Sequence, residues 1–158
     1  MDSNFHHWYQ CSVGDCPPFY DPVYFLPKLQ VDSAGRQIDT AHKRPPQQCN
    51  AAMPDEAIDQ CKTLYEAADG KKQKTAMDSF NDTGIMIMAL ICHHDIPLFF
   101  ANINTPGEQQ KYSIALIEHL FSLIPFEANV VILYDIGCVL GQSLMKVHMT
   151  QLHSIGLY

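Results

Sequence analysis

The chain has 158 residues, of which 47% are apolar and 17% are charged, a composition that suits one folded domain and excludes wholesale disorder. The formal net charge is −7, from 10 Lys and Arg against 17 Asp and Glu. Proteins that bind duplex DNA by neutralising phosphates need a basic surface, and the only basic run here is Lys71, Lys72 and Lys74. Charge alone therefore predicts weak DNA binding.

The first residues lack the pattern of a signal peptide, and no apolar run approaches the roughly 20 residues of a membrane span. We therefore expect an intracellular chain without a membrane segment. Reduced thiols or metal ligands are then the expected state of the cysteines. Their spacings include no Cys-x-x-Cys pair, so spacing alone gives little support for a metal site. The six cysteines are Cys11, Cys16, Cys49, Cys61, Cys92 and Cys138.

The first half of the chain begins with a short stretch, Asp2 to Tyr9, that we interpret as the remnant of a strand. From Cys11 to about Asp82, Pro and Gly are frequent and periodicity is weak, which excludes long regular elements around those residues. We expect Cys11 to Asn50 to be dominated by loops that pack loosely. One helix is predicted, from Pro54 to Ala68, because an acidic first turn precedes apolar residues at helical spacing.

Two apolar runs of strand length follow Thr83. Ile85–Cys92 and Ile96–Ile103 are separated by the polar residues His93-His94-Asp95, which predicts a β-hairpin. The next segment predicts a helix, with Thr105 as its cap and Glu108 completing a capping box. Pro125 would end this helix, and His119 would be a core histidine on its apolar face. That face repeats at steps of three and four through Tyr112, Ala115, Leu116, His119, Leu120 and Leu123.

Val130–Tyr134 is a β-branched apolar run typical of a buried central strand, with Asp135 directly after it. A last helix is expected from Val139 to about His153. The order of strand, strand, helix, strand and helix predicts a mixed α/β domain. We expect its main core in residues 83–153, with the three strands in one sheet and with residues 11–82 as a long loop-rich insertion.

Several blocks resemble the Kyakuja-Dileera-Zisupton (KDZ) transposases of fungi in the same order, over about residues 2–140. Asp2-Ser3-Asn4-Phe5 is similar to the family's first catalytic motif, an Asp followed by Gly-Asn-Phe, with Ser3 in the Gly place. Segments 14–20 and 43–46 are similar to the family's insertion. The other matching blocks are Asn81–Gly84, Cys92–Leu98, Asn102–Tyr112 and Leu133–Cys138.

The resemblance implies a partial RNase H-like fold and DDE-type chemistry, in which acidic residues hold Mg²⁺ for DNA strand cleavage and transfer. By position, Asp2 would be the first acid and Asp135 the second. Two Mg²⁺ ions about 3.5–4 Å apart activate the attacking oxygen and stabilise the leaving one. The family's third acid, a Glu on a later helix, has no counterpart before Tyr158. The resemblance therefore implies a truncated, inactive transposase domain, nuclear and DNA-directed if the family role is kept.

Other interpretations stay open. Asp135 is also a natural cap or turn residue, Asp2 could be a terminal acid without a role, and Asp95 or Glu108 could replace the missing acid. Cys92 and His94 resemble a Cys-x-His pair of the family that suits Zn²⁺, and Cys61 and Cys138 would be its partners. The competing interpretation of these cysteines is small buried hydrophobes. A non-enzymatic zinc-binding or protein-interaction module on an RNase H-like scaffold is therefore the alternative function.

Overall fold

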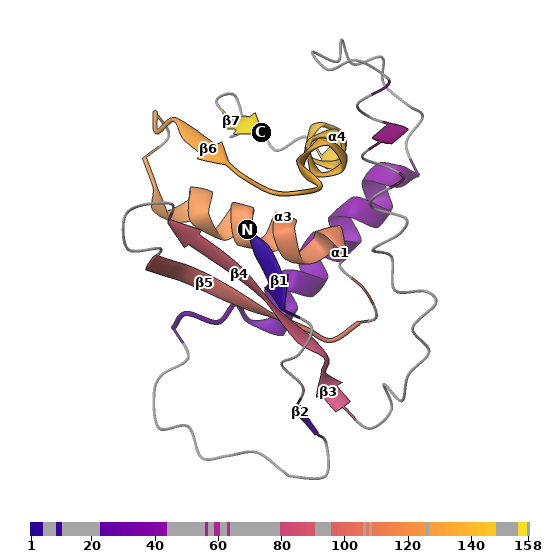
Figure 1. Cartoon of the computed structure of the whole chain (residues 1–158), viewed down its shortest axis with the longest axis vertical. Helices are drawn as coiled ribbons and strands as arrows, with labels where there is room; N and C mark the ends of the chain where they lie inside the picture. Colours follow the sequence, from indigo (N-terminus) through magenta and orange to yellow (C-terminus); the bar gives the residue numbers. More distant parts are fainter. Residues whose placement is uncertain are drawn as a thin grey trace.

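A computed structural model of the chain describes residues 1–4, 9–10, 23–43, 56, 59–60, 63, 80–90, 96–105, 107, 109–125, 127–147 and 155–157. Three layers are visible in Figure 1: a small antiparallel sheet, two helices packed on one of its faces, and a further helix with two short strands above them. The chain is therefore a mixed α/β protein, as its sequence predicts.

The hairpin expected from the two apolar runs is confirmed. Strands β4 (Gly84–Leu90) and β5 (Ile96–Ile103) pair antiparallel, with Ile85 opposite Asn102 and Ile87 opposite Phe100. Strand β1 (Asp2–Asn4) pairs antiparallel with the other edge of β4. The sheet order is therefore β1-β4-β5, and the short strand expected near Asp2 is its edge. Strand β2 (Tyr9–Gln10) pairs separately with β3 (Phe80–Asp82).

Helix α1 (Lys28–His42) contradicts the expectation of a loop-dominated, loosely packed stretch from Cys11 to Asn50. Pro27 stands at the N-cap, where its missing N–H costs no helical hydrogen bond. Apolar side chains at steps of three and four are buried in the core, which explains why the helix forms in spite of its polar composition. These residues are Val31, Ala34, Ile38 and Ala41.

Helix α3 (Gln110–Leu123) packs against both the sheet and α1. Its residues from Tyr112 to Ile117 are all buried, and α1 packs closely against it. A Cβ added to Gly35 of α1 would meet the Lys111 side chain at 3.5 Å. On the sheet side, the Ser113 hydroxyl contacts the Met86 sulfur at 3.4 Å. This part of the helix is therefore enclosed, which accounts for its apolar composition.

The short segment before α1 extends the sheet beyond β5. The Leu26 N–H donates to the Phe100 carbonyl and the Phe100 N–H to the Tyr24 carbonyl, both at 2.8 Å. Phe25 and Phe100 form a parallel bridge between these hydrogen bonds. Residues 24–26 therefore act as a fourth, parallel edge beside β5.

Strand β6 (Val130–Ile132) lies outside the sheet that holds the hairpin, so the expectation of one sheet is wrong. It pairs in parallel with β7 (Ile155–Leu157), a strand that the sequence did not predict. Helix α4 (Gly137–Val147) follows β6 and begins two residues before the expected Val139. One core nevertheless joins the two sheets, because Ile132, Tyr134 and Leu140 are buried with the residues of α1 and α3.

The helix expected from Pro54 to Ala68 lies mostly outside the described residues. Its described positions Glu56, Asp59, Gln60 and Thr63 are helical. The Thr63 hydroxyl donates to the Asp59 carbonyl at 2.9 Å, a contact typical of a helix. Among the helices that the structure describes, none is long and apolar enough to cross a membrane.

Candidate acidic site

Asp2 is the first residue of β1 and is exposed. It stands opposite Ile87 of β4, so the pairing with the central strand fixes its backbone. Its Oδ1 accepts the N–H of Ser3 at 2.8 Å. This contact orients the carboxylate and leaves Oδ2 without a hydrogen-bond partner in the described part of the chain.

Asp135 follows β6, and its side chain is exposed. Ile132, Tyr134 and Ile136 are buried, and the alternating residues are exposed. Asp135 Oδ1 accepts the Ile136 N–H at 2.9 Å, and the Gly137 N–H closes the turn onto the Tyr134 carbonyl at 3.0 Å. The interpretation of Asp135 as a turn residue therefore agrees with this structure. Its Oδ2, like that of Asp2, makes no hydrogen bond with the described residues.

One hydrogen bond brings the two acidic segments together. The amino group of Met1 donates to the carbonyl of Leu133 at 2.7 Å, although these residues are 132 positions apart. Asp2 is one residue from Met1 and Asp135 is two residues from Leu133, and consecutive Cα atoms are about 3.8 Å apart. Figure 1 shows the start of β1 below the segment that follows β6. The structure therefore places the backbone of the segment that carries Asp2 next to that of the segment that carries Asp135.

A third acidic ligand is not found in the parts of the chain that the structure describes, because they contain no group of three or more His, Cys, Asp or Glu side chains arranged to hold a metal. Asp95 and Glu108 lie outside the described residues, as do Cys61, Cys92 and His94. Cys138 lies in the first turn of α4, and only its backbone is described. The zinc site therefore stays a prediction.

Thr105 does not cap α3, which corrects the prediction of a helix beginning there. The helix begins at Gln110, and its N-cap residue Gln109 makes no side-chain capping bond. The Thr105 hydroxyl instead lies 2.7 Å from the hydroxyl of Tyr112. Tyr112 was predicted only as an apolar face residue, but its hydroxyl also binds both the backbone N–H and the side chain of Asn104. The sequence gives no signal for this contact beyond the presence of a tyrosine on a buried face.

Burial shifts the pKa of two side chains on α3. Desolvation raises the pKa of Glu118, and a hydrogen bond from the Gln37 side chain partly offsets this effect. Desolvation lowers the pKa of Lys111, while nearby Asp32 acts in the opposite direction. His119 is half-buried and packs edge-on against Phe99, with ring centroids 4.6 Å apart. His119 therefore contributes to the contact of α3 with β5, and none of these three side chains belongs to the acidic site.

The chain is an α/β protein in which two exposed carboxylates, those of Asp2 and Asp135, each accept a backbone N–H. The sequence model of the Kyakuja-Dileera-Zisupton (KDZ) transposase family matches residues 1–155, nearly the whole chain, so the chain belongs to this family. Neither the comparison with curated proteins nor that with solved structures gives a significant match.

Proposed function

We propose that Asp2 and Asp135 are two ligands of a divalent metal site for DDE-type cleavage and transfer of DNA strands. The observation that carries this proposal is the hydrogen bond between Met1 and Leu133, which sets the two acidic segments side by side. Membership in a transposase family supports DNA as the substrate, and a nuclear location would follow from that role.

The donor chemistry of these residues fits a hard cation such as Mg²⁺, which prefers carboxylate oxygens. Each carboxylate is exposed, and among the described residues each forms a hydrogen bond through Oδ1 alone, so Oδ2 could bind a cation. When bound, the metal would activate an attacking oxygen and stabilise the leaving one. The residues of this chain contribute by holding the two carboxylates on a strand and on a tight turn.

An RNase H-like arrangement is part of the same proposal. It requires β6 to lie beside the sheet that carries Asp2. The pairing of β6 with β7 counts against it, whereas the hydrogen bond from Met1 to Leu133 and the shared core support it. An experimental structure in which backbone hydrogen bonds link β1 to residues 130–134 would decide in its favour.

Metal binding by the purified chain tests the site directly. Titration with Mn²⁺, followed by loss of the free-ion electron paramagnetic resonance signal, should show a site that Asp2→Asn and Asp135→Asn each weaken about tenfold or more. The double variant should lose little beyond the single ones, because both changes remove ligands of the same site. Asp39→Asn, on the exposed side of α1, is the matched control and should bind as the unaltered chain does.

We expect the isolated 158-residue chain to bind the ion and yet to lack nuclease and strand-transfer activity. The described residues supply two carboxylates and no third ligand near them. Removal of one electrostatic partner commonly costs about 2.7–4 kcal/mol of transition-state stabilisation, and the charge of −7 also repels the phosphate backbone. Incubation with supercoiled plasmid in Mg²⁺ or Mn²⁺ at low salt should leave it intact. Metal-dependent nicking that Asp135→Asn abolishes would contradict the inactivity.

A further inference from the structure

The face of the sheet turned away from α3 carries a row of side chains that begins at Asp2. Residues paired across neighbouring strands place their side chains on the same face. Asp2 pairs with Ile87, Ile87 with Phe100, and Phe100 bridges to Phe25. Strands lie about 4.8 Å apart, so the Phe100 position is roughly 10 Å from that of Asp2 on the same face. An aromatic pair therefore lies in register with the first acid of the candidate site.

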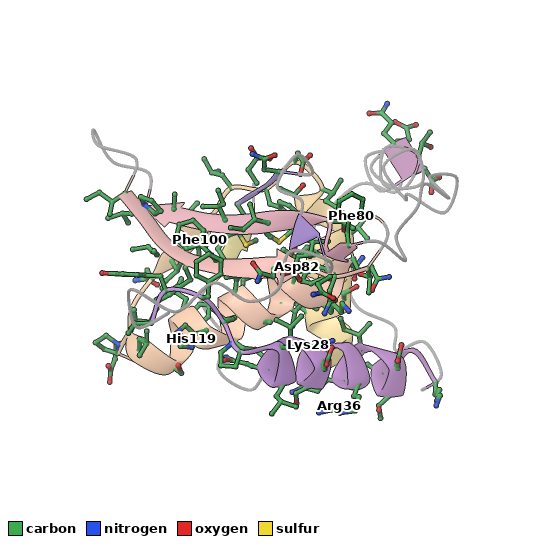
Figure 2. All side chains as sticks on the ribbon, turned by 90° about the horizontal axis from the view of Figure 1, so that it is seen from below. Lys28, Arg36, Phe80, Asp82, Phe100 and His119 are labelled. Carbon is green, nitrogen blue, oxygen red and sulfur yellow. The ribbon has the colours of Figure 1, made fainter. Side chains whose placement is uncertain are left out.

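The rings of Phe25 and Phe100 are stacked, with centroids 5.1 Å apart and an interplanar angle of 23°. The two backbone hydrogen bonds on either side of Phe25 hold the pair in place. Phe25 remains 38% exposed, so part of its side chain is open to solvent. The neighbouring Phe99 points to the other face, where it packs on His119. Figure 2 shows Phe100 on the sheet, apart from the helix that carries His119.

A polar side chain stands next to this aromatic pair. Asn102 is two residues beyond Phe100 on β5, so it shares the same face about 6.8 Å away, and it is exposed. Its Nδ2 donates to Asp82 Oδ2 at 3.2 Å, which fixes the orientation of the amide. Among the described residues its Oδ1 has no partner. Asn102 therefore places a hydrogen-bond acceptor on the same face as the aromatic pair.

We propose that Phe25 and Phe100 form a stacking platform for one unpaired base of the DNA strand whose backbone reaches Asp2, with Asn102 Oδ1 accepting from the exocyclic amino group of that base. The proposal rests on the proposed function, because it takes DNA as the substrate at Asp2. Base stacking on aromatic rings is the standard means of holding single-stranded nucleic acid. Stacking itself needs no positive charge, so the aromatic pair can hold a base although Asp2 and Asp82 repel the phosphates of any strand.

The separation of the two features suits a single strand. At the duplex rise of about 3.4 Å per nucleotide, roughly 10 Å corresponds to about three nucleotides, and to fewer in an extended strand. The platform would therefore hold a base close to the phosphate that lies at Asp2. Adenine, cytosine and guanine carry an exocyclic amino group and thymine does not, so the platform should disfavour thymine at the stacked position.

The test is binding of a short fluorescein-labelled single-stranded oligonucleotide, measured by anisotropy with the full chain in EDTA and at about 0.15 M salt, which screens the repulsion from the acidic side chains. Loss of one stacked base should weaken binding about 5- to 150-fold. We expect this loss with Phe25→Leu, which keeps an apolar side chain, and with a run of abasic sites in place of the bases. Phe25→Trp, which keeps an aromatic ring, should bind as tightly as the unaltered chain or more tightly.

Tyr24→Leu is the matched control. Tyr24 is an exposed aromatic residue in the same segment, but alternation puts it on the other face with buried Leu26. Equal affinity of the unaltered chain and Phe25→Leu, equal affinity for abasic and intact strands, or no measurable binding would each overturn the platform. Because EDTA removes the metal, the result is separate from the proposed function. Failure of Mn²⁺ binding alone refutes the acidic site, and failure of base-dependent binding alone refutes the platform.

Discussion

Removal of the Tyr112 hydroxyl is the substitution whose effect follows most directly from the structure. Tyr112 is fully buried. Its hydroxyl accepts the Asn104 N–H at 3.0 Å, donates to Asn104 Oδ1 at 2.9 Å, and lies 2.7 Å from the Thr105 hydroxyl, which then must be the donor of that contact. These three bonds tie the segment after β5 to the first turn of α3.

Tyr112→Phe keeps the ring and leaves no large cavity, so the loss comes from the hydrogen bonds. A buried polar group left without a partner costs about 1–3 kcal/mol. Asn104 and Thr105 are only half-buried, which lets water replace part of the loss. We therefore expect the free energy of unfolding to fall by about 1–2 kcal/mol. For a chain of this length the melting temperature should fall roughly 2–8 °C.

The same substitution has a pH signature. Burial raises the pKa of Tyr112. Below the ordinary tyrosine pKa of about 10 the hydroxyl is protonated in both the folded and the unfolded chain, and its full contribution to stability is present. As the pH rises through the higher pKa of the folded state, that contribution is lost, because the unfolded chain ionises first. The difference in stability between the unaltered chain and Tyr112→Phe should therefore shrink above about pH 10.

Urea denaturation at pH 7 and at several higher pH values measures both effects. Tyr24→Phe is the control, since Tyr24 is 62% exposed and surface changes stay within about 0.5 kcal/mol. A difference below about 0.5 kcal/mol for Tyr112→Phe at pH 7, or one that grows in alkali, would refute the assigned role of its hydroxyl.

Two further predictions concern α3 and the cysteines. Because burial raises the pKa of Glu118, the stability linked to its protonated form is present below the ordinary glutamate pKa and is lost as the pH rises through the folded-state pKa. Glu118→Gln should therefore raise the melting temperature at pH 7, with the gain disappearing near pH 4; no gain at pH 7 would contradict this. The zinc hypothesis for Cys61, Cys92, His94 and Cys138 predicts about one zinc per chain in protein prepared without chelator. Elemental analysis that finds far less zinc would refute the hypothesis, and the cysteines would then be free thiols.

The hairpin was predictable because its signal is local. Ile85–Cys92 and Ile96–Ile103 are apolar runs of strand length with a polar break, and pairing of neighbouring runs needs no knowledge of the rest of the chain. The body of α3 was predictable for the same reason, since its buried face repeats at helical steps. Its first residue was not, because the Thr105 hydroxyl binds Tyr112 instead of a helix N–H.

Helix α1 was missed because its signal is weak without its neighbours. Prolines precede it and Gly35 lies inside it, and both features argue against a helix when the sequence is considered alone. Only Val31, Ala34, Ile38 and Ala41 mark the buried face. Val31, Ala34 and Ile38 pack in the core shared with α3, so tertiary contact overrides local propensity.

Strand β7 was missed because parallel pairing joins segments that are distant in sequence. Ile155–Leu157 is three residues long and gains its partner only after α4 returns the chain to β6. The contact of Met1 with Leu133 is still less local. Nothing in the sequence except the resemblance to a transposase family indicated that Asp2 and Asp135 belong together.

The relative position of these two acids depends on packing more than on strand pairing. Asp2 belongs to the sheet of β4, and Asp135 follows the separate pair of β6 and β7. The hydrogen bond from the Met1 amino group to the Leu133 carbonyl joins the two segments, and Tyr134 and Ile136, on either side of Asp135, are buried in the core shared with α3. Core packing is close and resists small shifts. The buried contacts that hold α3 against the sheet therefore also hold the segment that carries Asp135.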